Sequence, residues 1–346
     1  MARLVSLLRS FLPFLLALPF LWLLQRAAGP YATIVLLIAG VNVILAVSLN
    51  VVNGFTGQFS LGHAGFMSVG AYATAKVMIS LSDVQLSFLP EALSDGLLFG
   101  VALAAGMAAA AVAGLLVGLP SLRLRGDYLA IVTLGFGEII RSVIQATPAG
   151  FLGASLGLSG LPLRTNLIWV GLGVVAVVVM SRRLATSTQG RALFAIREDE
   201  VAAEAMGVDT TGYKVRAFVI SAAYAGLAGG LTAHFIGSIE PTSFDFKRSM
   251  EVVVMVVLGG LGSITGSIVA AALLTLSLEL LREFQAYRMV AYALMLVVLM
   301  LARPQGIFGT REAWDLWRGW RARLGKGTAL PPRRSRSAAS PCASAA

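Results

Sequence analysis

Amide, hydroxyl and imidazole side chains gather in one short stretch of an otherwise apolar chain, Asn50–Tyr72. Such groups can hydrogen-bond a polar solute or the backbone around them. The stretch also carries five glycines, which makes it a poor helix. Polar, Gly-rich backbone at membrane depth persists only against protein or a water-filled cavity. We therefore expect a substrate pathway or gate here, with the candidate residues Asn53, Gln58, Ser60 and His63.

Two less specific explanations stay open for this stretch. Small residues let helices approach closely, and packing alone accounts for the glycines, although not for the amides or the histidine. His63 can also hydrogen-bond backbone groups that the break frees, without touching substrate. His234, in a later apolar run, is expected to serve in packing.

Charged residues within the apolar runs are the next candidates. Glu138 lies in a strongly apolar span, where a carboxylate is costly and is a functional candidate by default. Arg141 follows three residues later and could pair with it on one helix face, so a structural ion pair is an equal alternative. We expect Glu251 at the outer membrane interface rather than in the pathway.

Enzymatic chemistry has little support in the sequence. It contains no GxxxxGK[ST] motif for nucleotide phosphates, and no His or Cys cluster suited to a metal. Ser159 in a Gly-rich loop, with His234, could suggest an intramembrane serine protease, but we regard that as the weakest alternative. We expect no catalytic residues, no cofactor and no metal.

The composition indicates an all-α, polytopic membrane protein. Of the 346 residues 57% are hydrophobic and 13% charged, against about 25% charged in soluble domains, and the mean hydropathy is +0.82. We expect about 8–10 transmembrane helices, the first of them a retained helix rather than a cleaved leader. The predicted spans are Phe11–Leu24, Tyr31–Val52, Phe59–Ile79, Leu97–Leu119, Tyr128–Ala146, Leu167–Met180, Val215–Ile236, the longer Glu251–Leu281, and Arg288–Ala302.

Basic residues set the expected orientation. They precede the first span, lie in the loop between the fourth and fifth spans, and surround the loop after the sixth. All three places face the cytoplasm if the N-terminus does. From Arg303 onward nine basic and two acidic residues supply +7 of the net charge of +10. This tail suits a cytoplasmic C-terminus better than nucleic-acid binding. We divide the chain into a membrane domain, residues 1–309, and a basic, disordered tail, residues 310–346.

Topology predicts a second break. With the tail inside, Glu251–Leu281 cannot be one simple crossing, and its 31 residues would span about 46 Å as straight helix. We expect a re-entrant segment or a tight pair of short helices that breaks at LGGLGSITGS, Leu258–Ser267. Gly259, Gly262 and Ser263 join the pathway candidates. The Gly-rich centre resembles that of Val51–Gly65, which gives a weak internal repeat.

The loop of about residues 181–216 is the one sizeable polar segment between spans. Ile196–Met206 suits a short helix with acidic residues in its first turn, and Gly207 stands where a helix stop belongs. Such a helix could dock onto another protein, although an ordinary solvated connector is an equal alternative. The candidate coupling residues are Arg191, Arg197, Glu200, Ala203 and Gly207.

Four motifs resemble a known family. They are NGFTGQFSLGHAGFMSVGAY, GDYLAIVTLGFGEIIR (Gly126–Arg141), GRALFAIREDEVAAEAMGVDTTGYKVRAFVISA (Gly190–Ala222) and VVLGGLGSITGSIVAA (Val256–Ala271). In this order, between about Val41 and Gly309, they resemble the larger type of permease subunit of branched-chain amino acid ABC importers. The general coupling pattern of ABC permeases, Glu-Ala-Ala-x-x-x-Gly, is kept at Ala202, Ala203 and Gly207, but Val201 replaces the Glu and Glu200 lies one place early.

The resemblance implies a permease in the bacterial inner membrane, with both termini cytoplasmic. The implied partners are a homologous second permease, two cytoplasmic ATP-binding subunits, a periplasmic binding protein and the lipid bilayer, without nucleic acid. The implied activity is translocation of leucine, isoleucine or valine by alternating access. Two alternatives remain: a urea or short-amide permease of the same wider family, and a self-sufficient secondary transporter or channel.

Overall fold

The computed structural model describes residues 19, 21–81, 91–122 and 126–281, with isolated positions between 290 and 309. The chain divides into two compact units, Met1–Thr310 and Arg311–Ala346. The second unit, which holds the basic tail, lies outside the described residues. Most of the predicted spans Phe11–Leu24 and Arg288–Ala302 lie outside them as well.

Most of the described chain is helical, as predicted, and six of its helices are long and apolar enough to cross a membrane. The predicted span over Phe59–Ile79 starts late, at His63, because residues 57–62 form no helix. The six are α2 (Pro30–Asn50) with its continuation η1 (Val51–Phe55), α3 (His63–Leu81), α4 (Glu91–Ser121), α5 (Asp127–Ala146), α7 (Leu167–Thr186) and α10 (Thr210–Ile236).

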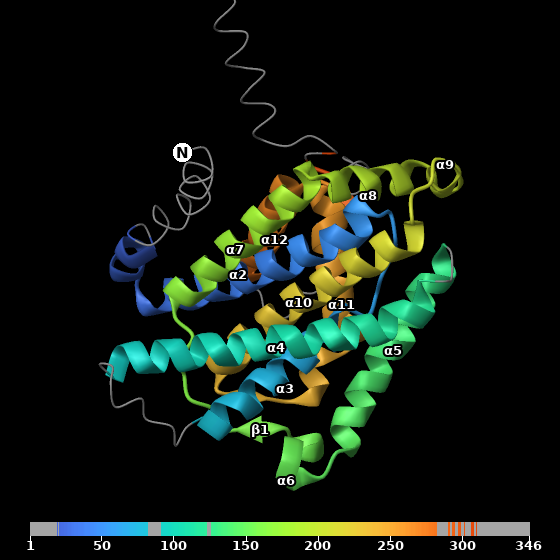
Figure 1. Ribbon diagram of the computed structural model, residues 1–346. Coiled ribbons are helices and arrows are strands. Elements are labelled where there is room, and N and C mark those ends of the chain that lie inside the picture. The colour runs from blue at the N-terminus through green and yellow to red at the C-terminus, as the bar shows by residue number, and fades with distance from the viewer. Residues whose placement is uncertain are drawn as a thin grey trace, which may run out of the picture. The chain divides into compact units, whose positions relative to one another are not determined.

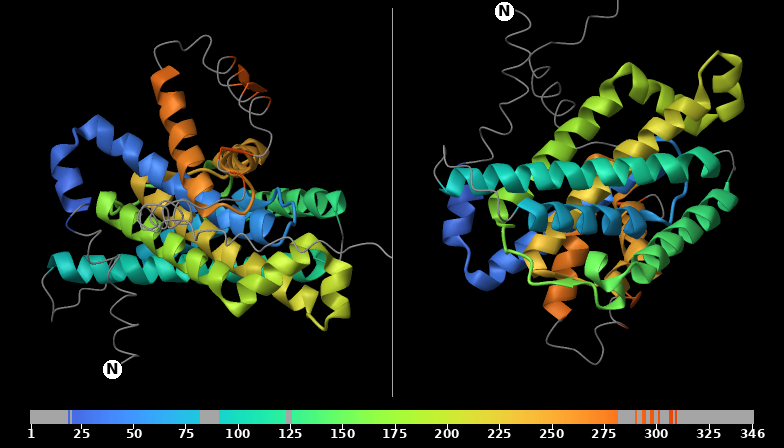
Figure 2. Two further views of the ribbon diagram at one scale, coloured as in Figure 1. Left: turned by 90° about the horizontal axis from the view of Figure 1, so that it is seen from above. Right: turned by 60° about the horizontal axis from the view of Figure 1, so that its bottom comes forward.

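Helix α10 is the centre of the packing. It contacts α3 and α4 most extensively and also lies against α2, while α3 and α4 lie side by side (Figure 2). Glycines permit this approach: a Cβ on Gly70 of α3 would overlap the backbone of Gly226 in α10, and one on Gly106 of α4 would stand 2.7 Å from the Gly70 carbonyl oxygen. Close packing therefore explains part of the glycine content, as small residues do at membrane helix interfaces.

Two short helices, α11 (Phe246–Gly259) and α12 (Ile264–Leu280), replace the long predicted span and confirm its break. Both follow α2, in opposite directions. Along α2, Asn42 contacts Arg248 of α11 and Thr275 of α12 (2.7 and 2.9 Å), and Asn50 contacts Gly262 in the turn between them. The two helices are therefore a hairpin packed on α2.

Shorter elements lie at the two ends of α10 (Figure 1). The helices α8 (Thr188–Glu198) and α9 (Glu200–Ala205) precede its start. At its other end the strand β2 (Ser238–Ile239) pairs antiparallel with β1 (Leu158–Ser159). Near these strands the chain also forms α6 (Ala149–Leu152), η2 (Ala154–Leu156) and η3 (Pro241–Phe244).

Candidate functional site

The first break begins where α2 changes from an α-helix to a π-helix at Val51. Thr56 ends this segment, because its backbone N–H (3.3 Å) and its hydroxyl (2.6 Å) both donate to the carbonyl of Val52. Residues 57–62 then form no helix until α3 starts. Short π-helical segments occur frequently at functional sites, so this backbone suits a gate.

Side chains satisfy backbone N–H groups that the break frees. Asn53 Oδ1 accepts from the N–H of Ser60 at 3.2 Å, and Thr133 Oγ1 of α5 accepts from the N–H of Leu61 at 3.1 Å. An unpaired backbone donor away from water is costly. Asn53 and Thr133 therefore hold the non-helical segment in place, whatever else they do.

His63 links the start of α3 to the contact between α2 and α10. It is 2% exposed, and its Nε2 shares a hydrogen bond of 2.6 Å with Ser48 Oγ of α2. Ser48 and Ser221 of α10 each donate from the hydroxyl to the other's backbone carbonyl, at 3.2 and 2.7 Å. This geometry supports the structural explanation for His63.

The second break is a turn built on glycine. Gly260 and Gly262 have φ of +104° and +90°, a region that side-chain-bearing residues rarely adopt. Ser263 Oγ accepts from the N–H of Gly266 at 3.0 Å and so caps the start of α12. Behind the turn, a Cβ on Gly259 would lie 2.6 Å from the Gly266 carbonyl oxygen, so the two helices touch there.

The two breaks meet, and a residue from a third segment joins them. Asn50 Oδ1 accepts from the N–H of Gly262 at 2.8 Å. A Cβ on Gly54 would stand 2.8 Å from Gly262 Cα, so the two backbones are in contact. Arg197 of α8 reaches the same place, and its Nη1 donates to the Gly54 carbonyl at 2.9 Å. We call Asn50, Gly54, Arg197 and Gly262 the junction.

Three amide nitrogens in the first break are buried and have no hydrogen-bond partner within the part of the chain that the structure describes: Asn50 Nδ2, Asn53 Nδ2 and Gln58 Nε2. The oxygens of Asn50 and Asn53 are engaged. That of Gln58 lies 3.3 Å from the Thr56 hydroxyl, whose proton is donated to the Val52 carbonyl at 2.6 Å. Buried donors are nearly always paired, so unpaired ones call for an explanation. These donors could bind a carbonyl or carboxylate if the break rearranged.

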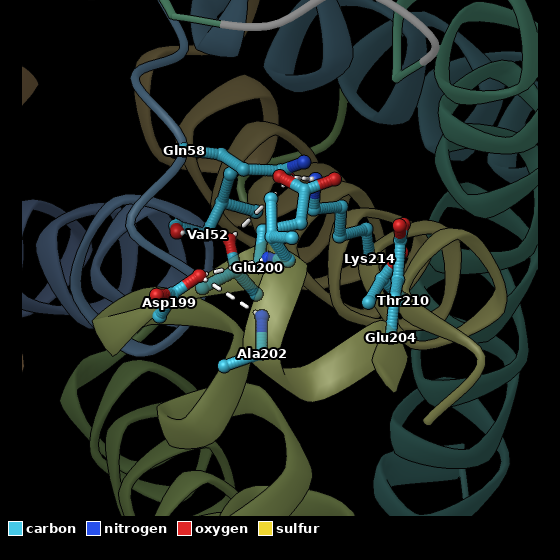
Figure 3. Close-up of polar contacts among 10 residues, drawn as sticks. Val52, Gln58, Asp199, Glu200, Ala202, Glu204, Thr210 and Lys214 are labelled. Atoms are coloured by element: carbon cyan, nitrogen blue, oxygen red, sulfur yellow. Dashed lines mark hydrogen bonds and ion pairs between the residues drawn. The ribbon is translucent and has the colours of Figure 1, made fainter. Parts of the chain in front are cut away.

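The loop between α7 and α10 corrects one prediction. A single helix over Ile196–Met206 is wrong, because α8 ends at Glu198 and α9 begins at Glu200. Asp199 separates them: its Oδ1 accepts from the N–H groups of Val201 and Ala202 at 2.9 and 3.0 Å (Figure 3), which caps a new helix. The predicted stop is confirmed, since Gly207 has φ of +83° and its N–H bonds back to the carbonyl of Glu204.

An ion pair with a buried lysine anchors this loop to α10. Glu200 Oε2 lies 2.6 Å from Nζ of Lys214, whose side chain is only 6% exposed. Glu204 adds a bond at the same helix, accepting from the Thr210 hydroxyl at 2.7 Å. Figure 3 shows both contacts, with Gln58 of the first break extending toward the Glu200–Lys214 pair. The pairing of Lys214 with Glu200 could not be predicted, because residues fourteen apart with a turn between them carry no fixed spacing.

Helix α9 leaves apolar side chains uncovered. Val201 and Met206 are 65% and 85% exposed, while Ala203 is the one buried residue of this helix. Ala202 and Ala205 are exposed as well. An exposed apolar face on a short, anchored helix is typical of a protein-binding surface.

The structure places the other predicted residues in two groups. Ala203 lies in α9, and Gly207 follows the end of this helix, whereas Arg191 is exposed on α8.

Glu138 forms the anticipated ion pair with Arg141 at 2.7 Å. It lines a small cavity beside the first break, and none of the four junction residues lines that cavity.

One polar cluster was missed by the sequence analysis. Arg248 bonds to Glu251 (3.0 Å) and to the Asn42 amide oxygen of α2 (2.7 Å). Asn42 is buried in the middle of a predicted span, and that position alone could have marked it. The role of Arg248 could not be predicted, because this residue precedes the predicted span Glu251–Leu281 and so falls in a predicted loop.

Enzyme-like groups do not assemble in the described chain. Among these residues no group of three or more His, Cys, Asp and Glu could hold a metal. His234 bonds to the Pro162 carbonyl at 3.0 Å and packs edge-on against Phe99, as expected for a packing residue. Ser159 lies in β1, opposite Ser238.

In the part of the chain that the structure describes, six apolar helices and a broken-helix junction define the class: a multi-pass membrane protein of the kind that moves solutes. The family model described as "Branched-chain amino acid transport system / permease component" matches residues 31–302. The chain belongs to this family.

The most informative relatives are two permease proteins named LivM. The "High-affinity branched-chain amino acid transport system permease protein LivM" of Salmonella typhimurium is 36% identical over 335 residues, and that of Escherichia coli 37%; each match covers 86% of this chain and 74% of the relative. The permease protein LivH of Escherichia coli is 32% identical over 147 residues, 42% of this chain and 47% of LivH. No solved structure matches the chain.

Proposed function

We propose that this chain is the larger permease subunit of an ATP-driven importer, which carries branched-chain amino acids across the inner membrane by alternating access. A homologous second permease, two ATP-binding subunits and a periplasmic binding protein complete the assembly. LivM and LivH, both named as permease proteins of one high-affinity transport system, support the pairing of two permeases. The ATP-binding subunits supply the energy, and this chain supplies the path.

The contact of Arg197 with both breaks carries the proposal. An importer must transmit a movement from its ATPases to a gate in the membrane. Arg197 belongs to the polar loop, yet it bonds to Gly54 in the first break and lies against Gly262 in the second. A displacement of α8 would therefore act on both breaks at once, because packed interiors respond as units.

Helix α9 supplies the docking surface for an ATP-binding subunit. Its exposed apolar face would be covered in the complex, with Val201 and Met206 as anchors. The Glu200–Lys214 pair fixes the helix to α10, so a push on α9 is not lost in a flexible loop.

In this arrangement the loop and both termini are cytoplasmic. The α11–α12 hairpin returns the chain to the outer side, and the predicted span Arg288–Ala302, which lies largely outside the described residues, would bring the tail inside.

The docking assignment can be tested by co-purification. Val201→Asp and Met206→Asp each place a charge on the proposed interface, so we expect membrane insertion with loss of the ATP-binding subunits and of uptake. Leu156→Asp is the matched control, because Leu156 is 90% exposed but lies beside β1, on the opposite side. Retention of both subunits by the α9 variants would contradict the assignment.

Substrate and energy source need a separate measurement. Proteoliposomes with the whole importer should accumulate leucine, isoleucine and valine only when ATP and the binding protein are present. Uptake of urea or short amides instead would favour the alternative substrate class. Transport by this chain without ATPases would establish a secondary transporter or channel.

A further inference from the structure

A cavity of about 290 Å³ lies between α2, α3, α10 and the β2–η3–α11 stretch. Its wall is mostly apolar, with Ile38 and Val41 from α2, Met67 from α3, Ile236 from α10 and Phe244 from η3. Small-molecule sites are mostly apolar pockets with a few placed polar groups, of roughly 300–1,000 Å³. This one lies at the lower limit, which suits a ligand of a few heavy atoms.

Two groups of opposite charge line the same cavity, Arg248 and Glu240. Arg248 uses one N–H for Glu251 and one for Asn42, and a guanidinium has five, so three donors remain. Glu240 accepts only from the Thr242 hydroxyl, at 3.4 Å, and makes no ion pair among the described residues. The cavity thus offers a cation with free donors and a carboxylate with free acceptors.

The cavity lies along the route from the strand pair to the junction. Arg248 is level with Asn42, twelve residues and so about 18 Å along α2 from Pro30. The junction lies eight residues further, at Asn50, or about 12 Å beyond. A solute that entered beside β2 would reach the cavity before it reached the two breaks.

We propose that this cavity binds the transported amino acid as a zwitterion. Arg248 takes the carboxylate, for which its planar fork is the best-suited side chain. Glu240 takes the ammonium group, and the apolar wall takes the branched side chain. The inference rests on the proposed function and adds to it a binding site within the permease itself, on the outer side of the junction.

A lipid acyl chain is the competing occupant, because an apolar cavity in a membrane protein can be filled by one. An acyl chain would bury against the apolar wall but would leave the free donors of Arg248 and the Glu240 carboxylate unused. The pairing of opposite charges with an apolar wall favours the amino acid.

Transport by the intact importer in proteoliposomes tests the site. Ile38→Trp should fill the cavity and lower leucine uptake at least about tenfold, while ATP hydrolysis stimulated by the binding protein persists. Ile34→Trp is the matched control, because Ile34 lies one turn earlier on α2, is similarly exposed and does not line the cavity. Glu240→Gln should lower uptake about tenfold through loss of one charge-assisted hydrogen bond. Full uptake by both cavity variants would overturn the proposal.

Photolabelling tests occupancy without depending on coupling. The full chain in nanodiscs would be irradiated with a diazirine analogue of leucine, and labelled residues mapped by mass spectrometry. We expect labels on Met67, Ile236 or Phe244 that L-leucine removes by competition and that Glu240→Gln loses. Labels insensitive to leucine would indicate an acyl-chain pocket, and no label there would refute the site. If wild-type importer takes up no amino acid, the proposed function fails separately.

Discussion

Arg197 Nη1 donates a hydrogen bond to the backbone carbonyl of Gly54 at 2.9 Å, across 143 residues of sequence. The bond joins the loop helix α8 to the end of η1, where the membrane helix gives way to the first break. A second contact supports it nearby, because Phe194 of α8 packs against Phe55 with ring centroids 5.2 Å apart. A movement of α8 must therefore either carry the first break with it or disrupt both of these contacts.

Replacing Arg197 should uncouple the importer. In Arg197→Ala the Gly54 carbonyl loses a charge-assisted donor, worth about 1.5–3 kcal/mol. Leucine uptake should fall about tenfold or more, while the ATPases stay bound and hydrolyse ATP. Arg197→Lys should recover part of the uptake, because an ammonium can still donate to the single Gly54 carbonyl but sits on a shorter side chain than Nη1.

Gln189→Ala is the control for this variant, since Gln189 is exposed in the first turn of the same helix. Transport and ATP hydrolysis should be measured on the same proteoliposomes. Uptake that fell only in proportion to ATP hydrolysis would mean that Arg197 supports assembly rather than coupling.

The contact of Gly54 with Gly262 predicts a steric effect. A Cβ on Gly54 would stand 2.8 Å from Gly262 Cα and still closer to its nitrogen, so Gly54→Ala must push the two breaks apart. Overpacking of this kind costs about 1–3 kcal/mol. We expect a lower midpoint of thermal unfolding, measured by fluorescence-detected size-exclusion chromatography.

Gly135→Ala serves as the control, because nothing lies within 4 Å of a Cβ at this helical position of α5. It should leave the midpoint unchanged or raise it, because alanine has a higher helix propensity than glycine, worth up to about 1 kcal/mol of unfolding free energy. An unchanged midpoint in Gly54→Ala would show that the breaks are loosely packed and that the close approach is not required.

The Glu200–Lys214 pair predicts that removing Glu200 alone destabilises the protein more than removing both charges. Glu200→Ala leaves Lys214, whose side chain is 6% exposed, without its carboxylate. An uncompensated buried charge costs about 3–5 kcal/mol. The double variant Glu200→Ala/Lys214→Met removes that charge, so it should regain most of the lost unfolding free energy. A double variant as unstable as Glu200→Ala would show that the carboxylate acts through another contact.

Both breaks could be predicted from sequence, because each rests on a local signal. Glycine and polar residues inside an apolar run mark the first, although the predicted stretch Asn50–Tyr72 is too long, because α3 is already helical from His63. The count of crossings requires the second, Leu258–Ser267. Their meeting could not be predicted. That contact depends on how α11 and α12 fold back along α2, which no local pattern encodes.

The loop shows the limit of reading helices by charge. The acidic residues around Asp199 agreed with one helix over Ile196–Met206, since acidic side chains favour the first turn. The same carboxylate is also a good N-cap, and in the structure it stops α8 and starts α9. The partners of Arg197 and Glu200 lay beyond local reasoning, because both bond to segments distant in sequence.

Replacing His63 distinguishes two roles for a polar residue of the first break: contact with substrate, or structural support of the break. Its bond to Ser48 at 2.6 Å lies beside the paired bonds of Ser48 and Ser221, so the interaction joins α3 to both α2 and α10. Hydrogen bonds between membrane helices contribute about 0.6 kcal/mol on average and up to about 1.7. His63→Ala should therefore lower the unfolding midpoint and leave the KM for leucine uptake unchanged.

Ser48→Ala should have a similar effect, and the double variant His63→Ala/Ser48→Ala should be less destabilised than the sum of the two, because both single variants remove one shared bond. Thermal unfolding of all three proteins and uptake over a range of leucine concentrations supply the measurements. If His63→Ala instead raised KM while Ser48→Ala did not, with equal stability of both, the imidazole would be a substrate contact and the first break would line the path directly.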